Sequence, residues 1–404
     1  MSFNAVATRR WQLYTYYYAL LIGLTAFRID FVQRRIYRWP RMQIYACTLN
    51  ALVVITLPLS YPISFEYLEY LNDNRLMKIV NAVNTTQLFS ITVLAIVFRW
   101  KREHTITEIL TRMLELEREY FQKCVPAAVK RYCEQIYSKR LLWIKYFSVI
   151  TQTLSTAFNL FTLVPELKFI WLLYAVHMIC VISVILHMIL HYFLAMWYLW
   201  QRFCWLNVQL LRIFNTLEQL THERYGLTLR RRMRRRLARE LMDVARVHRQ
   251  LTGFAERLTD CYRLQIVAVL LSKIINNISI GYLCFKYRSN SYLKSLGAFT
   301  QTFSCLALVM TLSDSFFLDI LCERVVIAAL ETAEVLKRFH ELLIVDDRLE
   351  YACDLLAQHL RQCKLRISIF GVIDVNKRLS FLVFGGFLKN VLLLLQWDLA
   401  KQFE

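Results

Sequence analysis

The segment Asn376–Trp397, with the sequence NKRLSFLVFGGFLKNVLLLLQW, decides the fold of this chain. It is the last long apolar stretch, and as a helix rising 1.5 Å per residue it would cross a bilayer core of about 30 Å. Two features are unusual for a plain membrane anchor. Gly385 and Gly386 would let another helix come close, and Lys389 would cost several kcal/mol if it faced lipid. We therefore expect a spanning helix that packs closely at the glycines and turns Lys389 away from lipid.

The composition of the 404 residues fits a helical membrane protein better than a soluble one. Apolar residues make up 57% and aromatic residues 14% of the chain, which has only 8 Gly and 5 Pro. A net charge of +20 would suggest a nucleic-acid partner in a soluble protein, whereas in a membrane protein it indicates basic cytoplasmic loops. The basic run Arg230–Arg236 is interpreted as a solvated turn or helix start, with contact to anionic lipid as the alternative. We predict membrane lipid as a partner and no nucleic acid.

Seven segments have the length and polarity of membrane-spanning helices. They cover residues 42–62, 79–98, 141–164, 169–200, 264–285, 296–321 and 377–397. Before them, the Tyr-rich stretch Trp11–Phe27 lacks a clear small-residue cleavage site, so it predicts an interfacial or re-entrant helix rather than a cleaved signal peptide. The sequence thus predicts one all-α membrane domain, residues 1–404, with seven transmembrane helices.

The distribution of basic residues predicts the orientation. Of the 50 Lys and Arg residues, 40 lie before the first span or in residues 99–140, 202–263 and 324–378. Cytoplasmic loops of membrane proteins are enriched in Lys and Arg. These four regions are therefore predicted to be cytoplasmic, which places the N-terminus in the cytoplasm and the C-terminus outside the cell.

Two of the predicted cytoplasmic regions, 201–263 and 322–376, have helical patterns. Their apolar residues recur at helical spacing, for example at Leu206, Leu210, Ile213 and Leu217 and at Leu237, Leu241, Val244 and Val247. Asp346-Asp347 interrupts the second region as a break and helix cap. We predict that long helices extend beyond the membrane and pack there as a bundle.

No motif for catalysis, phosphate binding or metal binding occurs in the sequence. The 11 cysteines have no C-x-x-C spacing, and His187 and His191, four residues apart, have no carboxylate or cysteine companion. We interpret these cysteines and histidines as packing residues. The chain is predicted to be no enzyme and to hold no metal or cofactor.

Charged residues within the predicted spans are the first functional candidates, because they are costly in lipid. Lys273 in the fifth span and Asp314 in the sixth lie at similar depths from the cytoplasmic side. Their charges are predicted to pair and to hold the two helices together. A direct part in gating is the alternative.

The predicted outer halves of the spans combine aromatic and neutral polar side chains. A pocket with this lining would bury a small organic molecule and orient it by a few hydrogen bonds, although an aromatic belt at the membrane surface explains the pattern equally well. The candidate pocket residues are Gln152, Thr156, Asn159, Phe161, Trp171, Tyr174, His177, Asn276, Tyr282, Gln301 and Phe303.

The chain as a whole resembles the insect gustatory receptor family, which is related to the insect odorant receptors. The resemblance rests on the seven spans, the cytoplasmic N-terminus, the short outer loops, the long charged linker between spans four and five, and the last span. There the family pattern is Thr-Tyr, five apolar residues and Gln-Phe. This chain has Lys389-Asn390, the apolar run Val391–Leu395, and Gln396-Trp397. It resembles a divergent member, because the Thr-Tyr pair is lost and Trp replaces Phe.

The resemblance implies a tetrameric, ligand-gated cation channel in the plasma membrane of sensory neurons. Four copies of the last span would line the pore, with Leu393 at a hydrophobic constriction and Gln396 near its outer side. The tetramer would contain this chain alone or related receptors as well. The ligand would be a small extracellular tastant, bitter or unidentified, and the cytoplasmic helices would join the subunits.

Lys389 is the residue that does not fit this picture. It lies four residues before Leu393 and would face the same lumen, where four ammonium groups would repel cations. One possibility is that Lys389 turns aside to a carboxylate or a carbonyl. The others are that this member conducts poorly, selects different ions, or serves as a non-conducting accessory subunit or scaffold.

Overall fold

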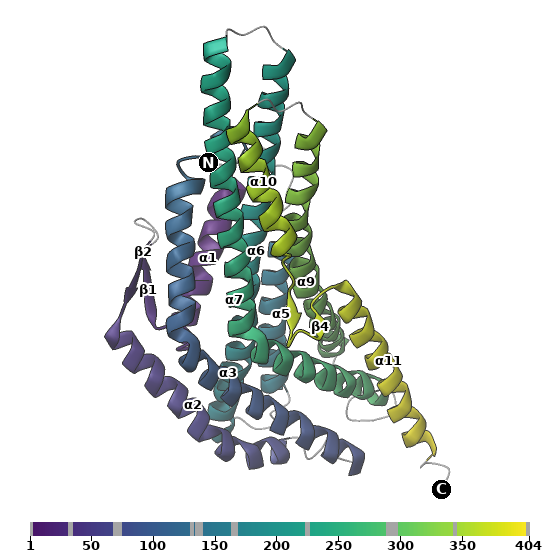
Figure 1. Cartoon of the computed structure of the whole chain (residues 1–404). Coiled ribbons are helices and arrows are strands. Elements are labelled where there is room, and N and C mark those ends of the chain that lie inside the picture. The colour runs from purple at the N-terminus through teal and green to yellow at the C-terminus, as the bar shows by residue number, and fades with distance from the viewer. Residues whose placement is uncertain are drawn as a thin grey trace.

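Long helices form almost the whole of the molecule in the computed structural model (Figure 1). It describes residues 3–30, 35–67, 75–129, 133, 140–162, 169–222, 227–287, 298–341 and 346–400. The helices are α1 (Phe3–Leu21), α2 (Pro40–Tyr67), α3 (Arg75–Leu116), α5 (Arg140–Thr162), α6 (Phe169–His222), α7 (Leu227–Tyr287), α9 (Ala298–Lys337), α10 (Asp347–Gln362) and α11 (Lys377–Ala400). A π-helical turn, Glu117–Phe121, follows α3, and a 3-10 turn, Arg338–Glu341, follows α9.

The seven predicted spans fall on α2, α3, α5, α6, α7, α9 and α11 wherever the structure describes them. Four of the described helices contain a stretch long and apolar enough to cross a membrane by length and composition alone. These stretches are Pro40–Ile63, Lys78–Phe121, Phe169–Thr221 and Lys377–Trp397. The number of crossings and the orientation of the termini stay predictions.

α6 and α7 are much longer than a membrane is thick. They contain 54 and 61 residues, which at 1.5 Å per residue is about 80 and 90 Å. They reach the top of Figure 1, far from the C-terminus, while α9 and α10 run beside them and end lower. We call this part of the molecule, formed by α6, α7, α9 and α10, the extended end. The predicted apolar stripes lie in its core, where Leu210 and Leu241 are both 0% exposed. The predicted cap is also confirmed, because the Asp346 side chain accepts a hydrogen bond from the backbone N–H of Arg348 at the start of α10.

Buried polar groups tie the helices of the extended end together. The Arg202 Nε donates to Glu117 at 2.6 Å, and its guanidinium lies 3.9 Å from the ring centre of Trp205. His248 Nδ1 of α7 lies 3.2 Å from His359 Nε2 of α10. Burial lowers the pKa of His248 from its ordinary value of 6.5 to about 4, so the pair is uncharged at neutral pH.

The N-terminal segment forms a helix that packs into the bundle. Tyr18 on α1 shares a hydrogen bond of 2.9 Å with Ser183 on α6, and Trp11 makes a ring contact with Trp143 on α5. α1 ends sooner than the predicted limit at Phe27. Gly23 has a φ of 68°, which ends helices readily because glycine has no Cβ.

Two short β-hairpins were not predicted from the sequence. The strands β1 (Phe27–Asp30) and β2 (Arg35–Arg38) pair antiparallel after α1. The strands β3 (Ser368–Ile369) and β4 (Ile373–Asp374) pair between α10 and α11, where the predicted extension 322–376 was expected to be helical. Such short strands carry too few residues for an alternating pattern to stand out.

Candidate functional site

α11 has one buried face and one open face. Ser380, Phe387 and Val391 follow each other at helical spacing and are 1%, 7% and 4% exposed. They pack against α9 and α7. The buried face therefore fixes which way the helix is turned within the bundle.

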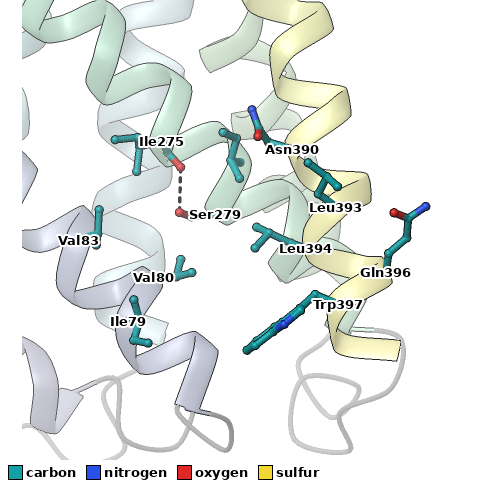
Figure 2. A pocket seen from close by; sticks show the side chains of 11 residues that line it. Ile79, Val80, Val83, Ile275, Ser279, Asn390, Leu393, Leu394, Gln396 and Trp397 are labelled. Atoms are coloured by element: carbon teal, nitrogen blue, oxygen red, sulfur yellow. Dashed lines mark hydrogen bonds between the residues drawn. The ribbon is translucent and has the colours of Figure 1, made fainter. Parts of the chain in front are cut away.

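The three predicted pore residues share the opposite side of α11. Lys389, Leu393 and Gln396 are all exposed, Leu393 to 51%. Leu382, which is 67% exposed, lies on the same side two turns earlier. We call these four residues the open face. Figure 2 shows the Gln396 amide pointing away from α3 and α7.

Lys389 does not turn aside within the described part of this chain. It is exposed, and no ion pair links it to a carboxylate of the described residues. Among the described residues, the ion pair at the start of α11 joins Lys377 to Glu323 at 3.4 Å. The open face thus carries a cation with no counter-charge from the described residues of this chain.

The predicted close approach at Gly385 and Gly386 is not found among the residues that the structure describes. A Cβ built on either glycine would meet no atom within 4 Å. The close contact lies instead on α7, where a Cβ on Gly281 would come within 3.0 Å of Phe387 and of Val391. Gly281 is therefore the glycine that lets α11 dock against its neighbour.

The predicted pair of Lys273 and Asp314 is confirmed, and a second lysine joins it. Lys273 Nζ donates to one oxygen of Asp314, and Lys145 Nζ on α5 donates to the other at 2.5 Å. Ser148 donates to Asp314 at 3.2 Å, and Gln152 donates to Ser148 at 2.9 Å. We call Lys145, Lys273 and Asp314 the charge triad. It joins α5, α7 and α9, and two cations in it share one carboxylate.

A second buried carboxylate links α9 to α11. Asp319, which is 1% exposed, accepts a hydrogen bond from Ser380 on the buried face of α11. Glu323, also on α9, accepts hydrogen bonds from the backbone N–H and the side chain of Lys377 at the start of α11. α9 thus holds the first turn of α11 through carboxylates.

Part of the predicted pocket comes together where α2, α5 and α6 meet. Tyr174 packs with Leu160 and Ile63, and its ring lies 6.2 Å from that of Trp171. His177 Nδ1 lies 3.2 Å from the Thr56 hydroxyl, while its buried Nε2 has no hydrogen-bond partner among the described residues. We name this group the outer cluster, consisting of Thr56, Ile63, Leu160, Trp171, Tyr174 and His177.

The other predicted pocket residues lie elsewhere or are not described. Thr156 donates to the backbone of Gln152, and Gln152 belongs to the hydrogen bonds of the charge triad. Asn276 and Tyr282 lie on the stretch of α7 that borders α11. The side chains outside the described part are those of Asn159, Phe161, Gln301 and Phe303.

A cavity of about 720 Å³ lies between α3, α7 and α11 (Figure 2). Its walls include Val80 of α3, Ile278 of α7 and Leu394 of α11. Leu393 and Gln396 of the open face also line it, whereas none of the predicted pocket residues that the structure describes does. Sequence reasoning missed this cavity because its apolar residues look like ordinary membrane packing.

Comparison with known proteins identifies the family. The family model described as 7tm Chemosensory receptor matches residues 12–401. The chain is 24% identical over 390 residues to the gustatory receptor for bitter taste 22e of Drosophila melanogaster, covering 95% of this chain and 93% of that protein. It is 27% identical over 171 residues to the putative gustatory receptor 58b of the same species, covering 42% and 41%.

The solved structures agree in fold. The insect olfactory receptor OR5 from Machilis hrabei in complex with eugenol superimposes with a TM-score of 0.68 at 13% identity, over 97% of this chain and 99% of that one. A second structure of the same receptor gives a TM-score of 0.69 at 14% identity. The relatives are receptors with membrane-spanning helices and not enzymes, as predicted. This chain is a multi-pass membrane protein and belongs to the 7tm chemosensory receptor family, whose named relatives here are insect gustatory and olfactory receptors.

Proposed function

We propose that this chain is a subunit of a ligand-gated cation channel in the plasma membrane of sensory neurons, opened by a small extracellular tastant. A bitter compound is the favoured class, because a relative similar over almost the whole chain is named as a receptor for bitter taste. The solved olfactory receptor in complex with eugenol supports a small organic ligand. The chain would assemble as a tetramer, alone or with related receptors.

The open face of α11 is the observation that carries this proposal. A membrane-spanning helix that faced only lipid would not carry a lysine near its middle and a glutamine on the same side, because both are costly there. Contact with a water-filled lumen removes that cost. In a tetramer, four copies of Leu393 would form a ring that excludes water until the helices move apart.

The outer cluster is the favoured ligand site for this proposal. Trp171 and Tyr174 offer aromatic surface, and the Nε2 of His177 offers one hydrogen bond that no described residue uses. Apolar walls with a few directed polar groups are typical of small-molecule pockets. An agonist that contacts His177 would push on α2 and α6 together.

A non-conducting accessory subunit is the second candidate, and Lys389 favours it. Four exposed ammonium groups around a narrow lumen would repel cations. In this case the chain would contribute its ligand site or its extended end to a channel whose other subunits conduct.

Whole-cell recording from cells that express the chain, alone and with related receptors, tests the proposal. A panel of bitter compounds would be applied to wild type, to Lys389→Thr and to Leu59→Thr. Leu59 is an exposed leucine of α2, so the last variant controls for a polar substitution on a lipid-facing side. Surface labelling would verify that all three reach the membrane.

The two candidates predict different currents. A conducting subunit gives tastant-evoked cation current in wild type, and Lys389→Thr raises its amplitude while Leu59→Thr does not. An accessory subunit gives no current alone, but changes the tastant response of a conducting relative. If protein at the surface evokes no current and alters no relative's response, the channel proposal is wrong.

A further inference from the structure

The cavity between α3, α7 and α11 lies beside the helix that carries the predicted gate. Its apolar walls come from three helices, with Val80 on α3, Ile278 on α7, and Leu394 and Trp397 on α11. Figure 2 shows Leu394 and Trp397 reaching from α11 toward α3. Its volume of about 720 Å³ is within the range of pockets that hold small organic ligands. Because most of its lining side chains are apolar, an apolar occupant is favoured.

The polar groups of the cavity indicate what kind of molecule fits. The Ser279 hydroxyl donates its proton to the backbone oxygen of Ile275 at 2.8 Å, so its oxygen is left to accept. The Asn390 side-chain nitrogen donates to the backbone oxygen of Gly386 at 2.8 Å, so its amide oxygen is left as an acceptor. Both groups therefore offer an acceptor to a ligand that donates a hydrogen bond, while Asn390 also keeps its second N–H.

The position of the cavity gives an occupant direct contact with α11. The helix is docked on α7 through Phe387 and Val391 at Gly281, and Asn390 and Leu394 line the cavity from the neighbouring side of the same turns. A molecule in this space would press on α11 beside its docking point. The outer cluster has no such contact, because its residues belong to α2, α5 and α6.

We propose that this cavity is a second binding site, separate from the outer cluster, for a small, largely apolar molecule with one hydrogen-bond donor. Its occupant shifts the resting position of α11. The effect on current rests on the proposed channel function, whereas the binding itself does not.

Binding can be tested with 1-aminoanthracene, an aromatic amine whose fluorescence rises in apolar surroundings. It would be titrated into the purified full-length protein in lipid nanodiscs, with empty nanodiscs as the partition background. Val80→Trp fills the cavity, Val80→Ala leaves it open, and Leu59→Trp adds the same indole on the exposed side of α2. Each variant must elute as a single species in gel filtration. If Val80→Trp does not, Ser279→Leu fills the cavity from α7 in its place.

The expected result is a saturable signal in wild type, Val80→Ala and Leu59→Trp, with at least tenfold weaker binding in the filled variant. Ser279→Ala should weaken binding several-fold, since it removes an acceptor. Equal binding to the filled variant, or no saturable signal from folded protein, overturns the proposal. Binding that appears only after the assembled protein is dissociated also overturns it, because a neighbouring subunit then occupies the space.

Recording separates this inference from the channel proposal. Where the chain or its complex conducts, 1-aminoanthracene should change the current of wild type and of Leu59→Trp but not of Val80→Trp. If the probe binds saturably but no combination of this chain with related receptors gives current, the binding site is supported and the channel proposal is wrong. If the probe binds but leaves the current unchanged, the claim that the occupant shifts α11 is wrong.

Discussion

Replacing Asp314 by Asn should destabilise the protein far more than replacing Lys145 by Met. Lys145 and Asp314 are 0% and 1% exposed, and Lys273 is 9% exposed, so all three charges lie away from water. Asp314 is the acceptor for both lysines. Its neutralisation leaves two neighbouring buried cations without a counter-charge, whereas the loss of Lys145 leaves one balanced pair.

The expected magnitudes follow from this arrangement. Breaking a buried ion pair by removing one partner costs roughly 3–5 kcal/mol, and two cations left together place Asp314→Asn at the upper part of that range or beyond. Met is apolar and similar in length to Lys, so Lys145→Met should change the free energy of unfolding by no more than about 1 kcal/mol. In the double variant, Lys145→Met should recover part of the loss caused by Asp314→Asn, because one of the two unbalanced cations is gone.

The free energy of unfolding can be compared by denaturant titration of the purified variants in micelles, followed by tryptophan fluorescence. Lys389→Met serves as the control, since it removes an exposed lysine that has no ion pair among the described residues. The reasoning is refuted if Lys145→Met costs as much as Asp314→Asn. It is also refuted if the two losses simply add.

Three further predictions concern packing, pH and the extended end. Gly281→Ala should cost about 1–3 kcal/mol and lower surface expression because its Cβ would crowd α11, whereas Gly253→Ala, with open space around it on the same helix, should be neutral or stabilise by up to about 1 kcal/mol. The pKa of His248 is lowered by burial from 6.5 to about 4, so the folded protein binds fewer protons than the unfolded chain. The free energy of unfolding should therefore be highest above pH 6.5 and fall as the pH drops, by up to about 3 kcal/mol below pH 4. In the same denaturant titration, His248→Gln should make the free energy of unfolding depend less on pH. Glu117→Gln should cost roughly 3–5 kcal/mol, since Arg202 would then be a buried cation without its carboxylate, and an unchanged denaturation midpoint would contradict this.

The sequence predicted those features that depend on periodicity and depth. The stripe containing Leu210 and Leu241 is buried because helical spacing places such residues on one face whatever the neighbours are. Lys273 and Asp314 could be paired because both lie a similar number of residues from the predicted cytoplasmic side. Spacing also predicted that Lys389, Leu393 and Gln396 share one side of α11, since successive members are separated by about one helical turn.

Features that depend on the rotation and crossing of helices could not be predicted. Lys145 lies within the predicted span 141–164, but only the rotation of α5 about its axis brings it to Asp314. Gly385 and Gly386 looked like the packing glycines of α11, while the contact is made by Gly281 on another helix, where a single glycine carries no pattern. The predicted pocket was divided for the same reason, because residues at similar depth, such as His177 and Asn276, lie on helices that border different neighbours.

Because α6 is long, a small tilt at one end produces a large displacement at the other. The helix runs without a break from Phe169, two residues before Trp171 of the outer cluster, to His222 at the extended end, a length of about 80 Å. A tilt of about 3° at the pocket would move the far tip by about 4 Å, which is comparable to the spacing of side chains in a packed interface. If the outer cluster binds the ligand as proposed, a protein or antibody fragment that holds this tip in place should weaken ligand binding at the other end of α6.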